Sequence, residues 1–216
     1  MMILPPLREE DCFIKLKFKE SQLQALNQIY TKYFLPKIDQ RYNGRAFVFL
    51  WDEDATWETG KGLDKHHSNP GYSASDCRQD PLWGEFADLL PYMNPSASVT
   101  KMPAGDVMRP HVDRQWRPNA IYFPISGCTE ACVSEYYNLP ITASTNSQAF
   151  PSSLWPMATH TYSVVDAPML TNVHLWHGVK NKSSFERTAF GWNMAKAKWT
   201  FAECKQILVD LGYADV

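Results

Sequence analysis

The sequence lacks any long hydrophobic segment. No apolar run among its 216 residues approaches the roughly 18 residues that a membrane-spanning helix needs, so we expect none. Its first residues combine a short apolar stretch with two prolines and three following acids, which is not the pattern of a secretory signal. A large excess of charge of one sign is also absent, because 21 Lys and Arg nearly balance 23 Asp and Glu and leave a net charge of −2. The basic residues are scattered, so we expect neither nucleic acid nor a membrane surface as a partner.

Cysteine is scarce and irregularly placed, with five residues at Cys12, Cys77, Cys128, Cys132 and Cys204. An odd number at uneven spacing argues against a disulfide framework, and we expect a reducing, cytoplasmic setting. Cys128 and Cys132 are close together, but no second pair of Cys or His follows at zinc-finger spacing. We interpret them as ordinary small residues that are buried or half-buried.

The composition that is present is typical of a globular protein, with 44% hydrophobic and 13% aromatic residues. The length fits a single domain covering residues 1–216. Within it we expect residues 1–96 to form helices, strands and a loop that pack on a core. Residues 97–194 would form that core, and residues 195–216 a C-terminal helix.

The first part of the chain mixes helix and strand patterns. Residues 13–19 alternate apolar and basic side chains, which predicts a strand. Ser21 has the chemistry of an N-cap, and the apolar spacing after it predicts a helix that Pro36 ends. Residues 45–51 predict another strand. Residues 52–80 are polar and without a period, so we expect either a loop that serves as a lid or a disordered segment. A short helix would follow, capped by Asp80 and running to about residue 90.

The later part of the chain changes character. Short apolar runs alternate there with Gly, Pro, Asn and Ser, at residues 97–102, 119–125, 131–137, 160–165, 169–179 and 185–194. This pattern is typical of a jelly roll or a related β-barrel. Thr200 and Glu203 form a capping-box pattern that predicts a last helix ending near Gly212. The predicted fold class is therefore mainly β with flanking helices around a jelly-roll, cupin-like core.

A candidate metal site lies within the predicted core. His111 and Asp113 are two residues apart, so on a strand both side chains would point to the same side of the sheet. His177 would complete a set of two histidines and one carboxylate, which leaves three coordination positions open on Fe(II). Open positions let a cosubstrate and dioxygen reach the metal. His174 would face the opposite way on a strand, so we expect it to lie outside the metal site.

A candidate anion site follows ten residues after His177, at Arg187. We interpret residues 180–184 as a hairpin turn and residues 185–192 as the returning strand. The guanidinium would then enter the same cavity from the neighbouring strand. Arginine suits a carboxylate because its planar fork donates two parallel hydrogen bonds.

The two segments resemble those of the Fe(II)/2-oxoglutarate-dependent oxygenase superfamily. The resemblance covers residues 99–194 and rests on Gly105 and Pro110 before His111, on Asn172, Val179 and Asn181 around His177, and on Arg187. It implies a double-stranded β-helix core, with Fe(II) and 2-oxoglutarate as cofactors and dioxygen as cosubstrate. His111, Asp113 and His177 would be the catalytic metal ligands, and Arg187 would hold the far carboxylate of 2-oxoglutarate. The implied reaction is hydroxylation of an unactivated C–H bond of a peptide side chain or small molecule, with release of succinate and CO2.

Two subfamilies share parts of this pattern. Residues 177–187 are similar to those of aspartyl/asparaginyl β-hydroxylases, which lack a carboxylate ligand at the position of Asp113. Prolyl 4-hydroxylases keep the His-x-Asp pair but carry Lys in place of Arg187. They also carry Tyr where this chain has Met102, so Tyr122 is our candidate for the missing cosubstrate contact. Halogenating relatives have a small residue in place of the Asp ligand, so Asp113 favours hydroxylation or a related oxidation.

Trp116 and Arg117 follow the Asp ligand, where substrates of the family often enter, although packing at a barrel rim explains them equally well. Two other functions stay open. One is a cupin-type metal enzyme that does not use 2-oxoglutarate, and the other is a non-catalytic jelly-roll module that binds a ligand or metal. The sequence leaves the substrate, the subfamily and the oligomeric state open.

Overall fold

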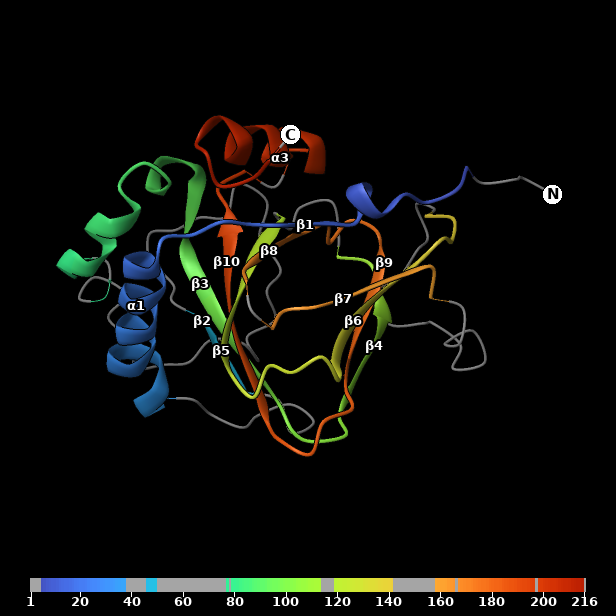
Figure 1. Ribbon diagram of the computed structural model, residues 1–216, viewed down its shortest axis with the longest axis horizontal. Coiled ribbons are helices and arrows are strands. Elements are labelled where there is room, and N and C mark those ends of the chain that lie inside the picture. The colour runs from blue at the N-terminus through green and yellow to red at the C-terminus, as the bar shows by residue number, and fades with distance from the viewer. Residues whose placement is uncertain are drawn as a thin grey trace.

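The computed structural model describes residues 5–37, 46–49, 77, 79–113, 119–141, 158–165, 167–196 and 198–215. Two antiparallel sheets dominate these residues, with helices gathered on the outer side of one sheet and at one end (Figure 1). None of the helices in these ranges combines the length and hydropathy that a membrane crossing requires.

The larger sheet has six strands and the smaller sheet four. In spatial order the larger sheet contains β1 (Phe13–Lys15), β8 (Met169–Thr171), β5 (Ala120–Ser126), β10 (Arg187–Met194), β3 (Met93–Met102) and β2 (Ala46–Phe49). The smaller sheet contains β4 (Val107–His111), β9 (Trp176–Asn181), β6 (Cys132–Tyr137) and β7 (His160–Ser163). From β3 to β10 the chain passes back and forth between the two sheets. This is the connectivity of a double-stranded β-helix, so the predicted fold class is confirmed.

Most of the helices cover the larger sheet. Helix α1 (Glu20–Ile29) continues into a π-helical turn (Tyr30–Phe34) and a 3-10 turn (Leu35–Lys37). Further 3-10 helices span Glu9–Asp11, Pro81–Phe86 and Leu90–Tyr92, and helix α3 spans Phe201–Asp210. The predicted capping box at α3 is confirmed, because the Thr200 backbone N–H donates to a Glu203 carboxylate oxygen at 2.6 Å and Thr200 Oγ1 accepts from the Glu203 N–H at 3.2 Å.

The main hydrophobic core lies between these helices and the larger sheet. Val99, Ile121, Phe123 and Phe190 project from three neighbouring strands into this core and are almost fully buried. Residues that alternate with them face the space between the two sheets. On that inner side the larger sheet carries small and polar residues such as Ser98, Thr100, Ala189 and Gly191. The inner side of the larger sheet is therefore more polar than the side that faces the helices.

Several predicted boundaries in the N-terminal part are wrong. Strand β1 ends at Lys15, because the chain then leaves the edge of β8. Ser21 lies inside α1, and the cap position falls on Lys19, whose N–H is bonded to the Gln22 side-chain oxygen at 3.0 Å. Asp80 is a cap as predicted, accepting from the Leu82 N–H at 3.0 Å, but the helix after it is a 3-10 helix. Most of the predicted loop, residues 52–76 and 78, lies outside the described residues, as do residues 45, 50 and 51 of the predicted strand.

Two predictions in the core region are also wrong. Residues 169–179 are two strands, β8 and β9, separated by a turn at residues 172–175. Residues 180–184 are not a hairpin turn, because β9 and β10 belong to different sheets and do not pair. The segment between them carries the chain across the barrel instead.

Candidate metal centre

The two histidines of the predicted site are cross-strand partners. His111 ends β4 and His177 lies near the start of β9, directly opposite it in the register. Directly opposed side chains project to the same side of a sheet, and the two ring centroids are 4.4 Å apart. The register between β4 and β9 shifts between Met108 and His111, where the β4 backbone approaches Gly178 closely. A Cβ at position 178 would lie 2.9 Å from the Met108 carbonyl oxygen, so this approach requires glycine.

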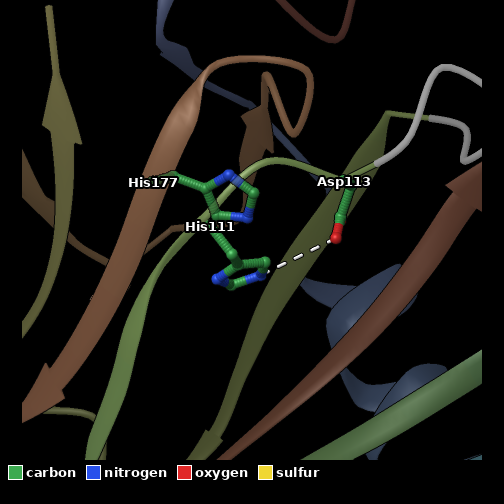
Figure 2. A group of neighbouring side chains, drawn as sticks. All are labelled: His111, Asp113 and His177. Atoms are coloured by element: carbon green, nitrogen blue, oxygen red, sulfur yellow. Dashed lines mark ion pairs between the residues drawn. The ribbon is translucent and has the colours of Figure 1, made fainter. Parts of the chain in front are cut away.

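Asp113 joins the histidines from beyond the end of β4, and not from within the strand as predicted. Its backbone N–H donates to the Val173 carbonyl at 3.0 Å, which ties it to the turn that precedes β9. One carboxylate oxygen lies 3.7 Å from His111 Nε2 (Figure 2). Figure 2 shows the two imidazole rings close together, with the Asp113 carboxylate directed towards His111.

The three side chains form a group that can hold a metal ion. One ligand atom from each of His111, Asp113 and His177 lies within 4.8 Å of the others. Asp113 and His177 are buried, whereas the His111 side chain is partly exposed. Among the described residues this is the only such group of three or more His, Cys, Asp or Glu. Two imidazoles and one carboxylate suit Fe(II) and leave positions open for other ligands.

Backbone carbonyls fix the orientation of both rings. His111 Nδ1 lies 2.8 Å from the Arg109 carbonyl oxygen, and His177 Nδ1 lies 2.8 Å from the Leu175 carbonyl oxygen. A carbonyl oxygen can only accept a hydrogen bond, so each Nδ1 carries the proton. In the neutral imidazole Nε2 then keeps its lone pair, which is the form of histidine that binds a metal.

Arg187 begins β10, in the sheet opposite the one that carries His111 and His177, where it is the cross-strand partner of Met102. It is only 4% exposed. Its Nη1 contacts the Met102 sulfur at 3.7 Å, and its Nε has no hydrogen-bond partner in the described part of the chain. A thioether is a weak acceptor, and a buried guanidinium without a full set of partners is costly. The arrangement therefore favours an incoming carboxylate, which would supply the missing acceptors.

The remaining predicted site residues fall in different places. Tyr122 lies on β5, and its ring packs against Gly191, where a Cβ would be 3.1 Å from the Tyr122 ring. It therefore faces the space between the sheets. Trp116 and Arg117 lie outside the described residues. His174 lies in the turn before β9, where its N–H donates to the Asn172 side chain at 3.1 Å, and it is not part of the metal-binding group.

Sequence reasoning missed Tyr136. It is the cross-strand partner of His177 in β6, so its ring lies on the same inner side of the sheet. It is fully buried, its hydroxyl has no hydrogen-bond partner in the described structure, and burial raises the pKa of Tyr136 well above its ordinary value. No local pattern marks this residue, because its place beside His177 depends on the pairing of β6 with β9.

Comparison with known proteins supports the fold. No family model and no curated protein matches the sequence. Among solved structures, the non-heme alpha ketoglutarate dependent carbocyclase SnoK from nogalamycin biosynthesis is 12% identical, with a TM-score of 0.50 over 86% of this chain and 81% of that chain. The chain is also similar to a Pseudomonas putida prolyl-4-hydroxylase, with 11% identity and a TM-score of 0.42 over 85% of this chain and 93% of that chain. It is similar as well to HygX from Streptomyces hygroscopicus, with 13% identity and a TM-score of 0.45 over 88% of each chain. At this identity the likeness to SnoK establishes a shared fold.

Proposed function

We propose that this protein is a non-haem Fe(II)- and 2-oxoglutarate-dependent dioxygenase. The observation that carries the proposal is the pairing of two features of one barrel. The His111, Asp113 and His177 group lies on the smaller sheet and its adjoining loop, and the buried Arg187 guanidinium lies on the larger sheet. A metal alone would explain the first feature but leave the second without a function.

The residues of the site would have separate roles in binding iron and 2-oxoglutarate. His111, Asp113 and His177 would hold iron, with both imidazoles oriented by backbone carbonyls. Arg187 would bind the distal carboxylate of 2-oxoglutarate through its fork and so set the position of that molecule in the barrel. The iron, when bound with 2-oxoglutarate and dioxygen, supplies the oxidising chemistry. Asn172 would support the site by holding the turn before β9, through bonds to the Asp11 carbonyl and the His174 N–H.

The reaction we propose is hydroxylation of an unactivated C–H bond of a peptide side chain or a small molecule. One oxygen atom of dioxygen would enter the new hydroxyl group and the other would enter succinate, while the 1-carboxylate of 2-oxoglutarate leaves as CO2. Asp113 supports hydroxylation, because a carboxylate ligand occupies the place that a halide would need. We further propose that the protein acts in the cytoplasm and has no nucleic-acid partner.

Removal of a metal ligand tests this proposal. With Fe(II), 2-oxoglutarate and a panel of amino acids, peptides and metabolites, the wild-type protein should form succinate faster when the right substrate is present. Asp113→Ala and His177→Ala should lower that substrate-stimulated rate by at least about 100-fold, because an incomplete ligand set loses iron. Unchanged succinate formation in either variant would show that the metal site is elsewhere.

A further inference from the structure

Asn181 occupies the last position of β9, four residues after the metal ligand His177, and is only 1% exposed. Residues four apart on a strand share a side, so its amide also faces the interior. The proposed reaction assigns this side chain no task. It is nevertheless one of the most fully bonded side chains in the described structure.

The side-chain NH2 of Asn181 joins two segments that meet at Arg187. Its nitrogen lies 2.9 Å from the Met102 carbonyl oxygen and 2.9 Å from the Pro103 carbonyl oxygen at the end of β3, and its two N–H groups are shared among three acceptors. It also donates to the carbonyl of Phe185 at 2.8 Å, two residues before Arg187. Met102 is both the cross-strand partner of Arg187 and the residue whose sulfur touches the guanidinium. Asn181 therefore holds the backbone on both sides of the arginine.

The side-chain oxygen of Asn181 organises the chain between β9 and β10. It accepts from the Ser183 backbone N–H at 3.2 Å and from the Ser183 hydroxyl at 2.7 Å, and the Cys132 thiol donates to it at 3.1 Å. Ser183 Oγ in turn lies 3.2 Å from the Phe185 N–H that donates to it. These are local side-chain turns of the Asn and Ser type, and they fix the path of a segment that has no sheet partner of its own.

We propose that Asn181 is a positioning residue for Arg187. Asn181 holds the guanidinium where it can bind the distal carboxylate of the cosubstrate. This inference rests on the proposed function. An arginine at the start of a strand has many rotamers, and a fixed backbone on both sides restricts them. Asn181 would then control the affinity for 2-oxoglutarate without touching either the cosubstrate or the metal.

The test compares 2-oxoglutarate with 2-oxobutyrate, a 2-oxo acid that lacks the distal carboxylate. Both are titrated calorimetrically into the Fe(II)-loaded protein without oxygen. The ratio of their dissociation constants reports how much the contact between Arg187 and the distal carboxylate contributes to affinity. The wild-type protein should bind 2-oxoglutarate at least about tenfold more tightly than 2-oxobutyrate. The free energy of a hydrogen bond to a charged group corresponds to about a tenfold change in a dissociation constant. Asn181→Ala should remove most of this preference and leave the affinity for 2-oxobutyrate and for Fe(II) unchanged.

Two further variants make the result decisive. Ser183→Ala removes the outer part of the network at a partly exposed position, and it should lower the preference about threefold even if Asn181→Ala fails to fold. Asn119→Ala is the matched control, because Asn119 is also a fully buried amide but bonds to Trp199 near α3. Asn119→Ala should lower the stability of the fold but keep the wild-type preference for 2-oxoglutarate over 2-oxobutyrate.

The outcomes separate the two proposals. A wild-type protein that binds both acids equally would contradict the role of Arg187 itself, and with it the proposed function. A wild-type preference that survives in both Asn181→Ala and Ser183→Ala would overturn only the role of Asn181. An equal loss of affinity for both acids in these variants would also overturn it, because that would be a general structural effect.

Discussion

At the scale of single residues, backbone carbonyls orient the two proposed histidine ligands. Each imidazole Nδ1 is bonded to the backbone carbonyl two residues earlier in the chain, at Arg109 in β4 and at Leu175 in the turn before β9. The local backbone geometry of β4 and of the turn before β9 therefore contributes to the orientation of His111 and His177. Arg187 differs, because its surroundings include the Met102 sulfur and an unfilled Nε position. We expect substitutions at Arg187 to change cosubstrate binding while the metal site stays intact.

Arg187→Lys tests this separation. A lysine keeps the positive charge but replaces two parallel hydrogen bonds with a point charge. The 2-oxoglutarate concentration needed for half-maximal succinate formation should rise about tenfold or more, whereas Fe(II) affinity should stay within about twofold. An unaltered 2-oxoglutarate requirement would mean that the cosubstrate binds elsewhere.

At the scale of secondary-structure elements, the close approach of β4 to β9 brings His111 and His177 together. Gly178 permits this approach, because the β4 backbone at Met108 and Pro110 occupies the place of a side chain. Gly178→Ala should push the strands apart and lower Fe(II) affinity about 10–100-fold, the loss typical of disturbed metal support. Fe(II) binding under anaerobic conditions measures this. Gly84→Ala is the control, since a Cβ at that position meets nothing within 4 Å, and it should bind Fe(II) as the wild type does.

Asp80 joins the π-helical turn after α1 to the 3-10 helix at Pro81–Phe86. Its carboxylate accepts from Lys32 Nζ at 2.6 Å, from the Tyr33 hydroxyl at 2.7 Å and from the Leu82 N–H. Together these bonds lower the pKa of Asp80 to about 2 in the folded protein, from 3.8. The stabilisation is therefore complete above about pH 4 and is lost as the pH falls towards 2, because the unfolded state takes up its proton first.

Asp80→Asn tests this link. The variant should unfold at a lower denaturant concentration than the wild type at pH 7. The difference between the two unfolding midpoints should narrow steadily as the pH falls from about 4 towards 2. Denaturant unfolding across this pH range is the measurement. A gap that stays constant with pH would show that the carboxylate charge does not contribute.

Local chemistry predicts elements better than it predicts their partners. The Thr200 and Glu203 capping box and the Asp80 cap are each encoded within four residues, so the sequence predicts both. Residues 169–179 read as one strand because Val173 and Leu175 continue the apolar run through a turn. The false hairpin at residues 180–184 has a similar cause, since no local pattern tells whether the next strand returns to the same sheet or crosses to the other.

The same limit applies to the candidate site. The spacing of His111 and Asp113 suggests that they share a side, but Asp113 lies past the end of the strand and is held by the Val173 carbonyl. The meeting of these residues with His177 requires β4 to pair with β9. That pairing, like the place of Tyr136 beside His177, comes from tertiary structure and is not encoded in any short segment.

The two sheets carry different parts of the proposed site, at the scale of the whole molecule. His111 and His177 belong to the smaller sheet, while Arg187, Met102 and Tyr122 belong to the larger sheet. A cosubstrate that reaches both the metal and the guanidinium must span the space between them. 2-Oxoglutarate, with a metal-chelating group at one end and a carboxylate at the other, carries the two functional groups that the proposed site would bind.

The most direct test of this account is an anaerobic titration of the wild-type protein with Fe(II) and 2-oxoglutarate, followed by visible absorption. A weak charge-transfer band should appear only when both are present, and Arg187→Lys should require more 2-oxoglutarate to reach the same intensity. A metal enzyme that does not use 2-oxoglutarate, or a non-catalytic binding module, would show no such band. Its absence at saturating Fe(II) and 2-oxoglutarate would contradict the account.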